Sequence, residues 1–188
     1  GLARGQLRLG SIQSLAPFVD LPASLGRFRA ALPGIDIELR LDGAADLLRE
    51  QPAAAARVKG LVLIAPAWDL TEELMWKQFP PEARRDLMEK GVYHQPSEYG
   101  EPYAITRRFI EEGRGHLIAP EPFDPGRPVL VLQGLQDQAV PAAHARRLSD
   151  VLKGGHVDIT EVPDGEHRLS RPEDLEKLYG LIERVLDA

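Results

Sequence analysis

Apolar residues along the chain fall into five short runs that predict β-strands. Two of the runs, at residues 58–65 and 128–133, are almost continuously apolar, as is typical of strands covered on both faces. Residues 35–41 alternate between apolar and polar, which predicts an edge strand with one solvated face. Residues 6–12 and 157–162 complete the set of predicted strands.

Segments with apolar residues at helical spacing lie between these strands and after the last of them. They predict helices at residues 15–32, 44–56, 71–77, 81–90, 104–113, 141–153 and 172–186. Strands that alternate with helices indicate an α/β fold, in which a doubly wound parallel sheet carries helices on both faces and so forms three layers. The segment at residues 67–127 lies between two buried strands and contains Trp68, Trp76, Tyr99 and Tyr103. It is predicted to be a helical lid insertion.

Composition narrows the classes of protein that fit. The 188 residues are 43% hydrophobic, which suits a single α/β domain with a sizeable core. The net charge of −6 argues against a general nucleic-acid binder, so no nucleic-acid partner is expected. No apolar run approaches the roughly 20 residues of a membrane span, and we recognise no secretory segment. We therefore expect no membrane partner.

Metal and thiol chemistry is not predicted. The chain contains no cysteine, which excludes disulfides, thiolate nucleophiles and cysteine-based metal sites. The five histidines show no metal-ligand spacing such as His-x-x-x-His, and the glycines do not match phosphate-binding patterns. We expect neither a metal nor a cofactor.

Candidate catalytic residues follow the last two predicted strands. Asp137 comes shortly after the run at 128–133, and His167 comes after the run at 157–162. Because active groups of such sheets gather at the carboxyl ends of the strands, these side chains are expected to meet as an orienting acid and a general base. The alternative interpretation is a turn aspartate and a solvated loop histidine.

Several motifs in the larger part of the chain match one enzyme family. They include Gly60-Leu-Val-Leu-Ile-Ala-Pro66, Leu70-Thr-Glu-Glu-Leu-Met-Trp76, Gln133-Gly-Leu-Gln-Asp137 and Asp164-Gly-Glu-His-Arg-Leu-Ser170. With these motifs, residues 52–188 resemble the C-terminal half of an α/β-hydrolase of the serine esterase type that includes palmitoyl-protein thioesterases. The resemblance implies that Asp137 and His167 are the acid and the base of a Ser-His-Asp triad.

The nucleophile elbow of that family, Gly-x-Ser-x-Gly, does not occur upstream of Asp137. The most similar segment is Gly10-Ser11-Ile12-Gln13-Ser14. Aligning the motif from Gly10 places Ile12 at the nucleophile position. Ser11 and Ser14 are the candidate substitutes for the missing nucleophile. The alternative for both is N-capping of the following helix, since a hydroxyl there satisfies an unpaired backbone amide.

The first segment matches a different family. It contains Leu7-Arg-Leu-Gly-Ser-Ile12, Leu15-Ala-Pro17, Leu25-Gly-Arg-Phe28 and Pro33-Gly-Ile-Asp-Ile-Glu-Leu39. Residues 1–45 thereby resemble the start of the effector-binding domain of a LysR-type transcriptional regulator. That resemblance implies that Ser11, Gln13 and Ser14 line a small-molecule pocket.

Together, the two resemblances predict a chimera with one α/β domain at residues 1–188 and a junction at 46–57. The regulator's first strand would replace the hydrolase's elbow strand. This gives about five parallel strands in the flavodoxin-like order 2-1-3-4-5, with the lid between strands 3 and 4. We interpret the chain as engineered, with a natural fusion or a truncated gene product as the alternatives. Because the two resembled families are cytosolic, the resemblances also imply a cytoplasmic location.

Three functions remain open. The leading one is a catalytically inactive scaffold that keeps an orphan Asp137–His167 pair. The second is a weak serine esterase or thioesterase that uses Ser11 or Ser14, and the third is a small-molecule binding module inherited from the regulator. The expected partners are a small-molecule ligand in the lid cavity and a second copy of the chain paired through a sheet edge.

Overall fold

The computed structural model describes residues 5–11, 35–41, 59–96 and 102–187. Among these residues no helix is long and apolar enough to cross a membrane. The predicted helices at 15–32 and 44–56 and the predicted junction at 46–57 lie outside the described residues. Residue Ser14 does as well.

A three-stranded parallel sheet forms the centre of the molecule. It contains β3 (Leu61–Ile64), β6 (Val129–Gly134) and β7 (Val157–Val162) in the order β3-β6-β7. Every residue of β6 is buried because this strand has a neighbour on each side and helices on both faces. The prediction of a buried strand at 128–133 is therefore confirmed.

The side chains of β6 alternate between two cores. Val129 and Val131 pack with Leu148, Val151 and Leu152 on one face. On the opposite face, Leu130 and Leu132 pack with residues of the C-terminal helix, Leu181 and Val185. This period of two is what a strand imposes on its side chains.

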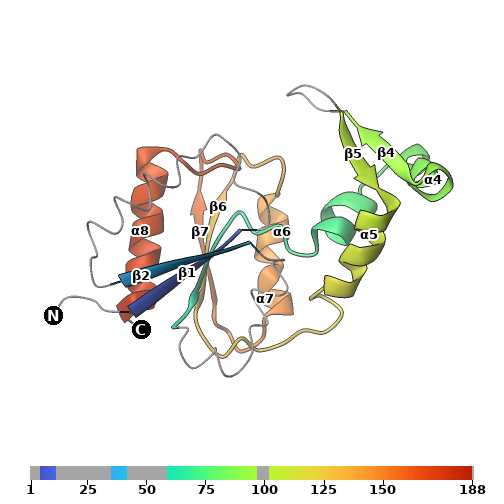
Figure 1. The fold of residues 1–188 in the computed structure, drawn as a ribbon. Helices are drawn as coiled ribbons and strands as arrows, with labels where there is room; N and C mark the ends of the chain where they lie inside the picture. The colour runs from blue at the N-terminus through green and yellow to red at the C-terminus, as the bar shows by residue number, and fades with distance from the viewer. Residues whose placement is uncertain (1–4, 12–34, 42–58, 97–101, 188) are drawn as a thin grey trace.

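Helices cover both faces of the sheet and form the outer layers (Figure 1). α8 (Pro172–Asp187) lies on one face, and α6 (Ala142–Arg146) and α7 (Leu148–Val151) lie on the other. The single helix predicted at 141–153 is wrong, because the chain forms two short helices there. Around Arg147 the backbone bonds connect residues three apart, Arg147 N to His144 O and Asp150 N to Arg147 O, and this interrupts the α-helical pattern.

The first two predicted strands also form. β1 (Gly5–Ser11) and β2 (Ile35–Leu41) pair in parallel, with Gly5 opposite Ile35 and Ser11 opposite Leu41. Within the described residues this pair is a separate two-stranded sheet and shares no ladder with β3. The continuous five-stranded order 2-1-3-4-5 therefore stays a prediction.

An insertion separates β3 from β6 and lies beside α6 and α7 (Figure 1). Its elements are the π-helix η1 (Leu70–Trp76), α4 (Pro81–Lys90), β4 (Val92–Gln95), β5 (Tyr103–Thr106), α5 (Arg107–Gly113) and the 3₁₀-helix η2 (Arg114–His116). The insertion has a small core of its own, formed by Phe79, Ala83, Leu87, Ile105 and Ile110. Its role as a lid stays a prediction.

The insertion is not purely helical as the sequence predicted. β4 and β5 form an antiparallel pair, with Val92 opposite Thr106. The helix predicted at 104–113 begins instead at Arg107, because the Thr106 side chain accepts a hydrogen bond of 3.1 Å from Phe109 N and caps the helix. The helix predicted at 81–90 is confirmed, and it ends at Gly91, whose φ of 78° permits the left-handed turn.

Trp68 joins the chain segment after β3 to α6. The indole is 1% exposed, and its Nε1 donates a hydrogen bond of 3.0 Å to the backbone oxygen of His144. The rings of Trp68 and His144 stack with centroids 4.2 Å apart. Burial lowers the pKa of His144 from its ordinary value of 6.5, which means that the folded protein favours the neutral ring.

The buried imidazole predicts a pH-dependent stability. As the pH falls below about 6.5, the unfolded chain binds a proton at His144 before the folded protein does, so the free energy of unfolding decreases. The variant His144→Phe keeps a ring in the stack and removes this part of the pH dependence. Urea unfolding between pH 5 and 8 measures it. The exposed His94, changed to Phe, is the control, and an unaltered pH slope in His144→Phe would contradict the prediction.

Candidate active site

The candidate site lies where β6 and β7 end. The two strands are parallel neighbours, and their last residues, Gly134 and Val162, are opposite each other. The chain therefore leaves both strands at the same edge of the sheet, with residues 135–141 after β6 and 163–171 after β7.

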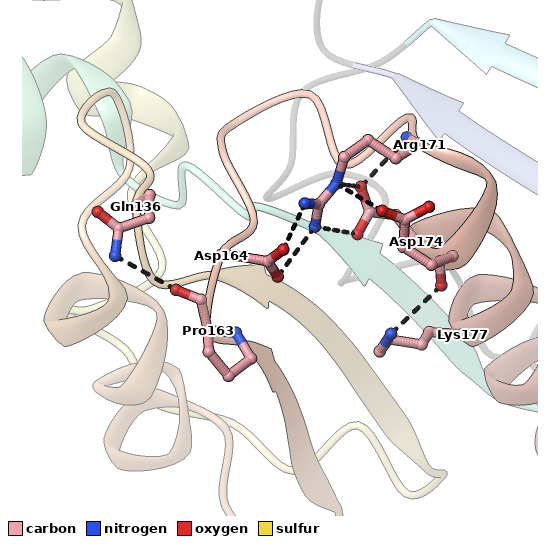
Figure 2. Close-up of polar contacts among 7 residues, drawn as sticks. Gln136, Pro163, Asp164, Arg171, Asp174 and Lys177 are labelled. Atoms are coloured by element: carbon pink, nitrogen blue, oxygen red, sulfur yellow. Dashed lines mark hydrogen bonds and ion pairs between the residues drawn. The ribbon is translucent and has the colours of Figure 1, made fainter.

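The two loops contact each other through their backbones at a pair of glycines. A Cβ atom on Gly134 would lie 2.4 Å from the carbonyl oxygen of Gly165, so no larger residue fits without a shift. Leu135 N donates to Val162 O at 2.9 Å, and Gln136 N donates to Gly165 O at 2.9 Å. The Gln136 side chain adds a hydrogen bond of 3.2 Å to Pro163 O (Figure 2). These contacts hold the loops in one relative position.

Asp137 and His167 meet across these loops. Asp137 Oδ2 lies 2.9 Å from His167 Nδ1. The Asp137 side chain is fully buried, whereas the His167 side chain is 52% exposed. The structure thus brings together the two residues that the sequence singled out; their catalytic roles stay a prediction.

The Asp137 carboxylate is held by its own loop. Its Oδ1 accepts hydrogen bonds from Ala139 N at 2.9 Å and from Val140 N at 2.8 Å. Both oxygens thus have partners, and Oδ2 faces His167. A carboxylate with backbone donors on one oxygen and an imidazole on the other can orient the ring.

Gln133 is a site residue that the sequence analysis did not identify. Its side chain is completely buried at the end of β6, and its Nε2 donates 2.9 Å hydrogen bonds to the carbonyl oxygens of Gly134 and Val140. Gln133 therefore links the two ends of the loop that carries Asp137. The available signal was a polar residue inside an otherwise apolar run, since buried amides are retained where they are hydrogen-bonded.

The arrangement can support proton transfer. With Nδ1–H donated to Asp137, the imidazole carries its free lone pair on Nε2, which can accept a proton from a hydroxyl or from water. The His167 side chain is half exposed, as a base that meets a substrate must be. Among residues 59–96 and 102–187, no hydroxyl is hydrogen-bonded to His167.

The structure does not test the two candidate nucleophiles. Ser11 is the last residue of β1, at the carboxyl end of a parallel strand. Ser14 lies outside the described residues. Their roles as nucleophiles or as helix caps therefore stay predictions.

A cleft lies at the base of the insertion. It encloses about 560 Å³ and is lined by charged residues of both signs, including Asp69, Glu73, Lys77 and Arg114. Asp69 also fixes the cleft wall, because its carboxylate accepts hydrogen bonds from Ile118 N at 2.8 Å and Ala119 N at 2.9 Å. Neither Asp137 nor His167 lines this cleft. In the described part of the chain, no three His, Asp or Glu side chains are grouped to hold a metal ion.

Comparisons with known proteins place this site in context. No family model matches the chain. The chain is 27% identical over 143 residues to the human protein named palmitoyl-protein thioesterase ABHD10, mitochondrial, an alignment that covers 75% of this chain and 46% of that protein. The chain thus spans less than half the length of this curated relative.

Solved structures extend the likeness to almost the whole chain. A structure assigned as a hydrolase of Agrobacterium vitis S4 superposes with a TM-score of 0.80 and 28% identity, covering 98% of this chain and 88% of that one. Mouse alpha/beta hydrolase domain-containing protein 10 superposes with a TM-score of 0.73 and 20% identity, over 97% of this chain and 89% of that one. The chain is thus homologous to the α/β-hydrolase ABHD10, and its fold is of the α/β-hydrolase type.

Proposed function

We propose that this protein is a serine-type hydrolase of carboxylic esters or thioesters, with Asp137 as the orienting acid and His167 as the general base. The observation that carries the proposal is the 2.9 Å contact between the buried Asp137 carboxylate and the half-exposed His167 ring. The hydrolase homologues support the reaction class. The thioesterase named among them supports an acyl thioester as the substrate class.

The reaction proceeds through an acyl-enzyme. A serine hydroxyl, which we assign to Ser11 or Ser14, attacks the substrate carbonyl carbon while its proton passes to His167 Nε2. His167 then returns this proton to the leaving alcohol or thiol as the C–O or C–S bond breaks. Water then attacks the acyl-enzyme while His167 takes its proton, and His167 returns that proton to the serine oxygen as the acyl C–O bond breaks, which releases the carboxylic acid and restores the serine.

Labelling with a fluorophosphonate tests the proposal. We expect one adduct by intact mass, located by peptide mapping at Ser11 or Ser14, and we expect His167→Ala to abolish it. The reason is that a serine hydroxyl near its free pKa is a weak nucleophile without an adjacent base. A folded wild-type sample that forms no adduct, or an adduct that persists in His167→Ala, would overturn the proposal.

A second candidate is a catalytically inactive scaffold derived from two parents, a LysR-type effector domain and a hydrolase. The observation that favours it is that Ile12 takes the nucleophile position when residues 10–14 are aligned with the Gly-x-Ser-x-Gly motif. In that case wild type forms no adduct, and Ile12→Ser gains an adduct at position 12 that depends on His167. Labelling of the wild-type chain at Ser11 or Ser14 would exclude this candidate.

The remaining predictions await measurement. A small-molecule ligand is proposed for the cleft at the base of the insertion, whose mixed charges suit a polar group rather than an acyl chain. Pairing of two copies through a sheet edge and a cytoplasmic location are proposed on the sequence alone; the homologue is named as mitochondrial. Analytical ultracentrifugation distinguishes a monomer from the proposed dimer.

A further inference from the structure

One arginine closes the loop that carries His167. The loop runs from the end of β7 to the start of α8, and Arg171 lies at its far end (Figure 2). The Arg171 guanidinium donates to both carboxylate oxygens of Asp164, from Nη1 at 2.6 Å and from Nη2 at 3.1 Å. Asp164 lies at the near end of the loop, so Arg171 joins the two ends with His167 between them.

The same guanidinium is bound to α8. Its Nε and Nη2 donate to the two oxygens of Asp174, each at 2.9 Å, and Asp174 is 1% exposed in the first turn of the helix. The hydrogen bonds from Arg171 lower the pKa of both Asp164 and Asp174, so both carboxylates are charged at neutral pH. Arg171 thus makes two bidentate contacts, the geometry for which a planar guanidinium is suited.

A second anchor holds the loop on the other side of His167. Leu169 is 2% exposed and packs into the core with Leu132, Val162 and Leu181. Its backbone adopts a φ of 43°, a conformation that is unfavourable for leucine and persists only where the surroundings impose it. Residues on both sides of His167 are therefore fixed, while its own ring makes one hydrogen bond in the described part of the structure, to Asp137.

We propose that Arg171 is a positioning residue for His167: by joining Asp164 to Asp174, it closes the loop so that His167 Nδ1 stays on Asp137. The inference rests on the proposed function, because it assigns a purpose to the Asp137–His167 contact. It assigns no contact between Arg171 and substrate. Its effect passes through the backbone of residues 164–171 alone.

The test observes the His167 Nδ1–H proton directly by NMR in ¹⁵N-labelled protein. The signal is assigned by its loss in His167→Gln. In Arg171→Gln we expect its exchange with water to accelerate about tenfold, because the loop opens more often once both bidentate contacts are lost. Asp164→Asn weakens only the exposed contact of Arg171, the one with Asp164, and we expect the exchange to accelerate about threefold.

The matched control is Arg184→Gln. Arg184 also lies on α8 and donates a hydrogen bond of 2.6 Å to an aspartate of β7, Asp158, but it is not part of the His167 loop. We expect no change in the Nδ1–H signal for this variant. We also expect the backbone amides in the centre of α8 to exchange at the wild-type rate in all three variants.

The outcomes separate this inference from the proposed function. Faster Nδ1–H exchange in Arg171→Gln and Asp164→Asn, with Arg184→Gln unchanged, supports it whether or not wild type reacts with the fluorophosphonate. Wild-type exchange in Asp164→Asn overturns it, as does equal acceleration in Arg184→Gln. Asp164 is exposed, so Asp164→Asn keeps the test decisive even if Arg171→Gln fails to fold. If wild type forms no fluorophosphonate adduct, only the proposed function is contradicted. The role of Arg171 is tested independently, because the NMR signal needs no nucleophile.

Discussion

Asp137→Asn is expected to slow the His167-dependent reaction roughly 10⁴-fold, the magnitude known for loss of the orienting acid in serine-protease triads. A neutral amide no longer stabilises the imidazolium that forms as the serine proton is transferred. Its NH₂ group also favours the wrong tautomer of the ring, with the lone pair on Nδ1. The measurement is the rate of fluorophosphonate labelling, followed by the rate of thioester hydrolysis.

The substitution keeps the local fold. The amide oxygen of asparagine can still accept the hydrogen bonds from Ala139 N and Val140 N, so the loop keeps its backbone contacts. Asp158→Asn, a change of the same chemistry at an exposed position of β7, serves as the control and should label at the wild-type rate. If Asp137→Asn also labelled at the wild-type rate, Asp137 would not be the acid.

Gly134→Ala is expected to lower the free energy of unfolding by about 3 kcal/mol, because the added methyl overlaps a neighbouring backbone. The alanine Cβ would lie 2.4 Å from the Gly165 carbonyl oxygen and 2.8 Å from that of Glu166. Backbone atoms cannot rotate away as a flexible side chain does, so the loops after β6 and β7 must separate. Urea unfolding monitored by circular dichroism measures the change.

Gly180→Ala is the matched control for this experiment. Gly180 lies inside α8, and a Cβ there would meet no atom within 4 Å beyond the neighbouring residues and backbone of the helix itself. Alanine is therefore expected to stabilise the protein by about 0.5–1 kcal/mol through helix propensity. If Gly134→Ala had at least wild-type stability, the close approach of Gly134 to Gly165 would not constrain the fold.

The local pattern of the sequence predicted the elements that dominate the core. The strand at 128–133 and the last strand at 157–162 form as β6 and β7, and the terminal helix predicted at 172–186 forms as α8. The first strand was predictable from its nearly continuous apolar run, the second from alternating positions and the helix from a period of 3.6 residues, because each pattern reflects burial on one or both faces. Local hydrogen bonds that shift the start of a helix or divide it were harder to detect in the sequence. The Thr106 cap moves the start of α5 to Arg107, and backbone hydrogen bonds between residues three apart around Arg147 divide the helix predicted after β6.

The sequence by itself predicted that Asp137 and His167 would meet, since each follows one of two successive parallel strands, and it holds no Gly-x-Ser-x-Gly motif within its 188 residues. Only the tertiary structure decided how the pair is held. Three contacts hold it: the close approach of Gly134 to Gly165, the hydrogen bonds of the buried Gln133 amide, and the bidentate contacts of Arg171. The hydrophobic pattern of the sequence predicts none of these contacts. The spacing of apolar residues shows which side of each strand or helix is buried in the core. Contacts between two loops exist only after β6, β7 and α8 have docked, because docking sets the distance and orientation of the groups involved.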